Sequence, residues 1–131
     1  MSGHLKERRV LIVDDQPSLL NALRRTLSSD YAVVAVESAE EALAKLEGGV
    51  QFDAIVTDTN MPGMRGPRLL DVVRTRWPDI ARVIMSGDDQ GEAQVAYADG
   101  RAHEFLVKPW SSGEPEARIA AAIGKVERRS L

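Results

Sequence analysis

The stretch Val-Leu-Ile-Val-Asp-Asp at residues 10–15 decides the fold class, because four apolar residues run without interruption into two carboxylates. A strand that is covered on both faces carries such a continuous apolar run, whereas a strand exposed on one face alternates apolar and polar residues. Four further runs of this kind follow along the chain, at residues 32–36, 54–56, 83–85 and 105–107. We therefore predict five short strands buried between two layers.

Each apolar run is followed by a stretch with the pattern of a helix. The clearest start is Ser38, because Glu41 stands three residues later and the pair can satisfy two amides at a helix end. This helix should end at Gly48-Gly49, which tolerate the backbone of a helix end. The other helices are expected after Pro17, at about 65–76, at about 91–99 and around 119–126. Strand and helix alternate five times, which predicts an α/β fold with a parallel sheet, a single doubly wound (βα)5 domain.

The ends of the predicted strands carry polar residues. The first strand ends in Asp14-Asp15, the third in Asp58, the fourth in Ser86 and the fifth in Lys108-Pro109. In sheets of this type ligands bind at the carboxyl ends of the strands. Three close carboxylates repel one another, and a bound cation relieves that repulsion. Oxygen ligands in a chain without cysteine favour a hard cation such as Mg²⁺, which takes one or two carboxylates plus phosphate oxygens.

Phosphoryl chemistry fits this set of residues. An aspartate can attack phosphorus and carry the phosphoryl group as an acyl phosphate. Mg²⁺ and an ammonium such as that of Lys108 would neutralise charge on the transferring oxygens. We therefore predict that Asp58 is phosphorylated with the help of Mg²⁺. Taken alone, an aspartate at a strand end is as often a turn residue or a helix cap. The coincidence at four strand ends of five favours the site.

Composition limits the class of protein. The chain has 131 residues, which suits one domain, and a formal net charge of −3, which gives no indication of nucleic acid or an anionic membrane. It contains no cysteine, which excludes a disulfide framework and fits a reducing compartment. The start of the chain lacks the apolar segment of a signal peptide, and no apolar run approaches the roughly 20 residues of a membrane helix. We expect a cytoplasmic domain that contacts neither membrane nor nucleic acid directly.

The chain resembles the receiver domains of two-component response regulators. The resemblance rests on Val13-Asp14-Asp15, on Asp58-Thr59-Asn60-Met61-Pro62-Gly63 followed by Gly66, on Ser86-Gly87, and on Lys108-Pro109. Each motif is weak alone, but all four in this order are highly specific. The resemblance implies a flavodoxin-like sheet with the strand order 2-1-3-4-5. It suggests an N-terminal extension at 1–8, a receiver domain at 9–127 and a C-terminal tail at 128–131.

The resemblance implies roles in phosphoryl transfer. Asp58 would accept the phosphoryl group from a phosphohistidine on a histidine kinase or a phosphotransfer protein. Ser86 would bond a phosphoryl oxygen, and Lys108 would pair with the phosphoryl group. The Lys108-Pro109 peptide bond is expected to be cis, which is the usual setting for a cis bond.

The resemblance also implies a metal site. Asp15 and Asp58 would bind Mg²⁺ directly, and Asp14 would act through a water molecule or as a supporting base. The main-chain carbonyl of Asn60 would be a further ligand. Gln16 stands where the family commonly has an acid, which would weaken metal affinity without removing a direct ligand.

Two further pairs of residues bear on signalling. Ser86 and Phe105 would form the switch that moves the face made by the fourth helix, the fifth strand and the fifth helix, where an output domain or protein binds. Phe105 has no hydroxyl, so its part in the switch would rest on packing; otherwise it is simply a core residue. Asn60 and Asp88 would flank the path of the hydrolytic water. An amide and an acid at these two positions resemble those of family members that lose phosphate quickly.

Two other functions remain open at this stage. A phosphatase of the haloacid-dehalogenase type also uses an aspartyl phosphate, but it needs an acid two residues after the nucleophile, where this chain has Asn60. A receiver-like module that signals without phosphate is the second alternative. We expect a switch and not a turnover enzyme, one that catalyses at most its own phosphorylation and dephosphorylation. The arginines at 65, 68, 74 and 76 are expected to form a solvated helix face.

Overall fold

The computed structural model describes residues 7–87 and 91–129, and in these ranges five strands alternate with five helices, as predicted. The strands are β1 (Arg9–Val13), β2 (Ala32–Val36), β3 (Ala54–Asp58), β4 (Ala81–Ser86) and β5 (Glu104–Val107). The helices are α1 (Pro17–Leu27), α2 (Ala39–Glu47), α3 (Gly66–Arg76), α4 (Gly91–Ala98) and α5 (Glu114–Arg129). Helix α5 therefore includes the first two residues of the segment 128–131 that was expected to be a tail.

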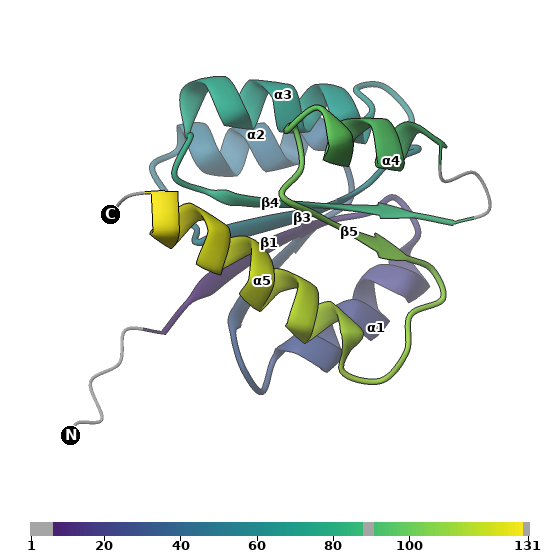
Figure 1. Cartoon of the computed structure of the whole chain (residues 1–131). Coiled ribbons are helices and arrows are strands. Elements are labelled where there is room, and N and C mark those ends of the chain that lie inside the picture. Colours follow the sequence, from purple (N-terminus) through teal and green to yellow (C-terminus); the bar gives the residue numbers. More distant parts are fainter. Residues whose placement is uncertain (1–6, 88–90, 130–131) are drawn as a thin grey trace.

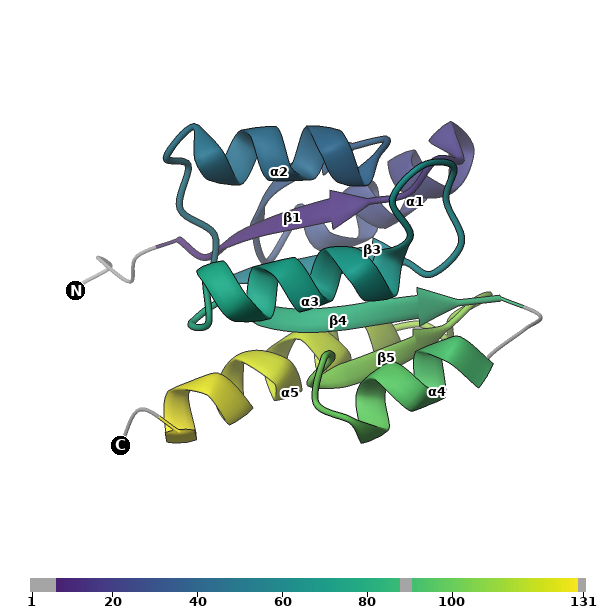
Figure 2. The same ribbon diagram turned by 90° about the horizontal axis from the view of Figure 1, so that it is seen from above.

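The five strands form one parallel sheet in the order β2-β1-β3-β4-β5, which confirms the expected order. Helices α2, α3 and α4 cover one face of the sheet, and α1 and α5 cover the other (Figure 1). The view from above shows α2, α3 and α4 lying across the sheet, with α5 beneath it (Figure 2). Strands β1 and β3 are neighbours at the centre, so their carboxyl ends lie side by side.

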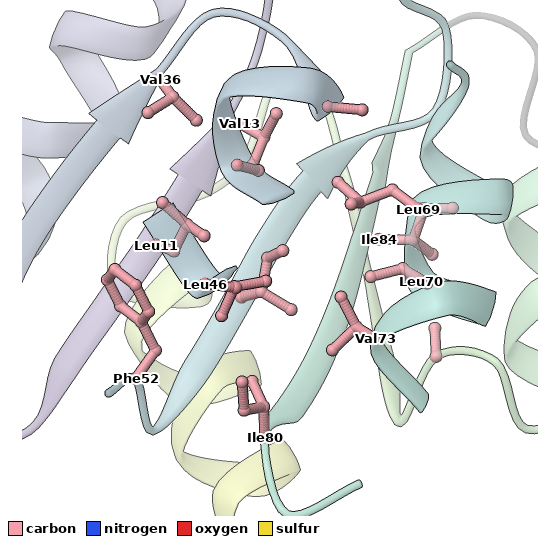
Figure 3. Packing of buried hydrophobic residues seen from close by; sticks show 14 of the residues in the cluster. Leu11, Val13, Val36, Leu46, Phe52, Leu69, Leu70, Val73, Ile80 and Ile84 are labelled. Atoms are coloured by element: carbon pink, nitrogen blue, oxygen red, sulfur yellow. The ribbon is translucent and has the colours of Figure 1, made fainter. Parts of the chain in front are cut away.

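The apolar runs fill two hydrophobic layers, one on each face of the sheet. Leu11 and Val13 of β1 face the layer under α2, α3 and α4, together with Leu69, Leu70 and other side chains that Figure 3 shows. Val10 and Ile12 of the same strand face the layer under α1 and α5. Alternate residues of one strand thus enter opposite layers, which is why the run is apolar at every position.

The helix ends follow the local signals in the sequence. The hydroxyl of Ser38 accepts a hydrogen bond from the amide of Glu41 at 3.1 Å, as expected for the start of α2. The Glu41 carboxylate accepts from the amide of Glu37 at 2.9 Å, one residue earlier than a capping box requires. Gly49 has a φ of 91°, and Gly113, just before α5, has a φ of 82°. None of the helices in the described part of the chain combines the length and apolarity needed to cross a membrane.

Candidate functional site

The carboxyl ends of four strands bring the predicted residues to one edge of the sheet. Asp58 is the last residue of β3, and Ser86 is the last residue of β4. Asp14 directly follows β1, and Lys108 directly follows β5. The amide of Lys108 donates to the carbonyl of Ser86 at 2.8 Å, which extends the pairing of β4 and β5 up to the lysine. The Lys108-Pro109 bond is cis, as expected.

Three carboxylates meet at this edge. Asp14, Asp15 and Asp58 each offer an oxygen, and these oxygens lie within 4.8 Å of one another. Asp14 is fully buried and Asp58 is 6% exposed, so the first and third carboxylates are largely removed from water. The amide of Gln16 donates to Asp14 Oδ1 at 2.9 Å, so the turn into α1 holds this side chain in place.

Lys108 lies between two of these carboxylates. Its ammonium is 3.0 Å from Asp58 Oδ1 and 3.2 Å from Asp14 Oδ2, and its side chain is 13% exposed. One ammonium therefore compensates two buried carboxylates at once, and the edge retains an excess of negative charge.

The environment of Asp58 disfavours its charged form. Burial raises the pKa of this carboxyl above its usual range, and the charge of Asp14 raises it further. Hydrogen bonds from Lys108 and from the amide of Thr59, which donates to Asp58 Oδ1 at 2.9 Å, act in the opposite direction. A divalent cation at this edge would remove the repulsion that raises the pKa. The donors are all carboxylate oxygens, so the residues present fit Mg²⁺ better than a soft metal.

Asp15 and Asp58 open onto a pocket of about 900 Å³. Its lining brings together residues from every strand end named above: Asp15, Gln16, Asp58, Thr59, Asn60, Arg65, Ser86, Gly87, Glu92, Lys108 and Pro109 are among them. Ser86 is buried at its wall, and Asn60 is exposed at its mouth. Asp58 is thus reachable by a group that enters from solvent, and Lys108 and Ser86 line the same space.

Phe105 lies on β5 beside helix α4. Its side chain is half-buried and packs against the hydrophobic layer that contains Ile84 of the neighbouring strand. Its ring centroid is 6.1 Å from that of Tyr97 on α4. Tyr97 and Val95 are both exposed on α4, and of the two it is the ring of Tyr97 that lies beside Phe105. Asp88, the second residue expected to tune phosphate lifetime, lies outside the described residues.

Two residues of the site were given no role in it from the sequence. Thr59 donates from its hydroxyl to the carbonyl of Met85 at 2.6 Å and from its amide to Asp58, which connects Asp58 to β4. Arg65 was expected on a solvated helix face; its side chain is indeed 42% exposed, but it stands at the N-cap position of α3 and has two partners. Its guanidinium donates to the side-chain oxygen of Asn60 and pairs with Glu92 at the start of α4. A contact with a residue 27 positions away leaves no local pattern that could have predicted it.

Comparison with known proteins gives the same result as the geometry. The family model described as response regulator receiver domain matches residues 10–120. The hydrogenase transcriptional regulatory protein HoxA of Cupriavidus necator is 39% identical over 127 residues, which are 96% of this chain and 26% of HoxA. The chain thus spans about a quarter of the length of that relative.

Solved structures agree in fold. An adenylate cyclase structure from Rhodopirellula baltica superposes with a TM-score of 0.87 and 34% identity, covering 95% of this chain and 93% of that chain. The response regulator protein TrrA from Thermotoga maritima, solved in complex with Mg²⁺-BeF, gives a TM-score of 0.78 and 25% identity, covering 88% of this chain and 98% of that chain. This chain belongs to the response regulator receiver domains of two-component signalling.

Proposed function

We propose that this receiver domain is switched by phosphorylation of Asp58, with a histidine kinase or a phosphotransfer protein as the donor. The observation that carries the proposal is the placement of Lys108, whose ammonium lies against both Asp58 and Asp14 at the base of an open pocket. This arrangement puts a fixed positive charge where the negative charge of a transferring phosphoryl group would build up.

In the proposed transfer, an oxygen of Asp58 attacks the phosphorus of a phosphohistidine. We assign the attack to Oδ2, because Oδ1 already accepts from Lys108 and from the amide of Thr59. The new P–O bond forms as the P–N bond breaks, and the electron pair of the broken P–N bond stays on the imidazole nitrogen of the donor. The product is an acyl phosphate on Asp58, and Ser86 and Lys108, which line the same pocket, would bond its oxygens.

Asp15 and Asp58 would hold the Mg²⁺ ion directly, with the main-chain carbonyl of Asn60 as a further ligand, and Asp14 would act through a water molecule or as a supporting base. When bound, the ion supplies charge compensation for the phosphoryl oxygens. The Mg²⁺-BeF complex of TrrA, a protein of the same fold, supports this part of the proposal. Asp14 is fully buried, so its role is to support the other two carboxylates from behind.

We propose that the signal leaves through α4, β5 and α5. Phosphorylation adds about −1.5 to −2 charge and strong acceptor oxygens at the end of β4. Ser86 can follow that charge, and the space that it leaves allows Phe105 to repack against Tyr97 and α4. The exposed side chains of Val95 and Tyr97 would then meet an output domain or an output protein. HoxA is a transcriptional regulatory protein and is much longer than this chain, which is consistent with an output part outside the matched region.

We infer a short-lived phosphate and no turnover of other substrates. Asn60 lines the pocket two residues after Asp58, where a phosphatase of the haloacid-dehalogenase type needs an acid. Its amide would instead influence how water reaches the acyl phosphate. A hydrolysis time course on the purified phosphoprotein measures this, and persistence of the phosphate for many hours would contradict it.

The test of the proposed function is labelling by acetyl phosphate with and without Mg²⁺. The wild-type domain should take up one phosphoryl group in a Mg²⁺-dependent manner, and Asp58→Asn should take up none. If Asp58→Asn labels as well as wild type, the assignment of the acceptor is wrong. If neither protein labels and neither binds beryllofluoride with Mg²⁺, the domain is a receiver-like module that signals without phosphate.

A further inference from the structure

Arg65 connects the loop after β3 with the start of α4. It stands at the N-cap position of α3, with an extended backbone (φ −83°, ψ 160°), and its side chain lines the pocket above Asp58. Its Nη1 atom donates to Asn60 Oδ1 at 2.5 Å. Its Nη2 atom forms an ion pair with the carboxylate of Glu92, in the first turn of α4. One guanidinium therefore contacts both the loop after β3 and helix α4.

The ion pair contributes little to the stability of the fold. The side chain of Arg65 is 42% exposed and that of Glu92 is 50% exposed, and pairs as exposed as this are weak in water. We infer that the ion pair acts by fixing the relative positions of its partners. A guanidinium is a rigid planar fork with several donors, so it can fix two partners in one arrangement, whereas an ammonium is a point charge.

The partner that matters for chemistry is the side chain of Asn60. An exposed asparagine at the mouth of a pocket would sample several rotamers if nothing held it. The bond from Arg65 takes its side-chain oxygen, so the amide nitrogen is turned away from the guanidinium. Asn60 is the residue that the proposed function assigns to the lifetime of the acyl phosphate, so its orientation should affect the rate of hydrolysis.

Helix α4 buries few large side chains, so we expect the ion pair of Glu92 to affect the position of this helix. Within its eight residues it buries Ala93 and Ala96, both small. At its other end the guanidinium of Arg74 on α3 donates to the carbonyl of Asp99 at 3.3 Å. Two arginines from the α3 side thus hold the two ends of α4, and the one at the pocket is Arg65.

We propose that Arg65 is a positioning residue of the phosphorylation site. It holds the side chain of Asn60 in the arrangement that favours hydrolysis, and its pair with Glu92 makes that arrangement depend on α4. The inference rests on the proposed function of Asp58. A partner that binds α4 and displaces Glu92 would slow the loss of phosphate and so lengthen the signal while it is bound.

The experiment measures the first-order rate of phosphate loss from protein labelled with acetyl phosphate, with unbound donor removed. Arg65→Gln should slow the loss by about threefold or more, because Asn60 is released. Glu92→Gln should slow it in the same direction but less, because it removes the ion pair and keeps the bond to Asn60. Arg68→Gln is the matched control, an exposed arginine on α3, and it should decay at the wild-type rate.

A double-mutant cycle separates positioning from a general effect of charge. In an Asn60→Ala background, Arg65→Gln should have no further effect on the rate, because the group that it positions is gone. An equal effect of Arg65→Gln in both backgrounds, an unchanged rate, or faster decay would each overturn the proposal. If wild type is labelled and Arg65→Gln loses phosphate at the wild-type rate, this inference alone is refuted. If wild type fails to label, the proposed function is refuted as well.

Discussion

Gly66 packs directly against the main chain of Asp58. A Cβ at residue 66 would lie 2.0 Å from the carbonyl oxygen of Asp58 and 3.1 Å from the Cα of Thr59. Both contacts are with backbone, which cannot turn aside as a flexible side chain could. The amide of Gly66 also donates to the carbonyl of Thr59 at 3.0 Å. The start of α3 is therefore held so close to the loop after β3 that only glycine fits between them. Asp58 is therefore positioned by a residue that carries no functional group.

Gly66→Ala should damage both stability and phosphorylation. The methyl group forces α3 away from the end of β3, and overpacking of this kind typically costs about 1–3 kcal/mol. The shift also moves Asp58 relative to Lys108, so labelling by acetyl phosphate should slow. Urea unfolding and labelling rates measure the two effects. The same substitution at Gly124, in the interior of α5 and facing the flexible end of Arg128, should be neutral or stabilising.

Lys108→Ala should make the domain depend on Mg²⁺ for stability. Without the ammonium, the carboxylates of Asp14 and Asp58 lose their shared partner and repel each other. A loss of about 1–3 kcal/mol is expected in the presence of EDTA. Added Mg²⁺ should raise the melting temperature of this variant more than that of wild type, because a bound cation now relieves a larger repulsion. Lys45→Ala, at an exposed lysine on α2, is the control and should respond like wild type.

The stability of the domain should fall as the pH drops from about 6.5 to about 4, in part because of His103. Burial lowers the pKa of His103 to about 4, and the charges of Arg82, Arg129 and Lys125 act in the same direction, while Glu104 opposes them. Its Nδ1 atom accepts a hydrogen bond from the amide of Arg82 at 3.0 Å, which requires the neutral ring.

The unfolded chain therefore binds a proton at His103 in that pH range and the folded chain does not, so protons favour unfolding. His103→Asn should show a smaller loss of stability between these two pH values than wild type. Thermal melts of both proteins across the range measure the difference. Parallel pH profiles would show that His103 does not contribute.

Phe105→Leu should separate phosphorylation from its readout. The substitution keeps an apolar side chain against the hydrophobic layer and removes the ring that faces Tyr97, for an expected cost of about 1 kcal/mol. Labelling of Asp58 should proceed at the wild-type rate, since Phe105 does not line the pocket. The change in amide hydrogen exchange of α4 on phosphorylation should shrink. An undiminished change would show that Phe105 is a core residue without a part in the switch.

The order and type of the elements could be predicted from the sequence, because each strand is an uninterrupted apolar run. The strand ends were harder to predict where a polar residue is buried. β4 begins at Ala81 and includes Arg82, whose guanidinium donates to the carbonyls of Gly100 and Arg101. β3 continues through Thr57 to Asp58, and Thr57 is fully buried. A charged or hydroxyl side chain normally indicates the end of a buried strand. Here tertiary hydrogen bonds compensate the burial of Arg82, and a local bond to the carbonyl of Asp58 at 3.0 Å compensates that of the Thr57 hydroxyl.

Some residues of the site could be predicted from the sequence and others could not. Asp14, Asp58 and Lys108 could be predicted because each directly ends or follows an apolar run, and parallel strands share one carboxyl edge. The strand order followed from resemblance and not from the residues themselves. Arg65 could not be predicted, because its role depends on Glu92, which the fold brings close from another helix.

Helix α4 buries Ala93 and Ala96, while Val95 is exposed and Tyr97 is exposed on one side and lies beside the ring of Phe105 on the other. The two alanines that pack into the domain and the exposed Val95 are therefore different residues on this helix. During divergence of such domains, a position such as Val95 can change with little effect on the fold. A duplicated gene can thus acquire a new partner through substitutions at exposed positions of this helix, while the residues at the sheet edge are retained.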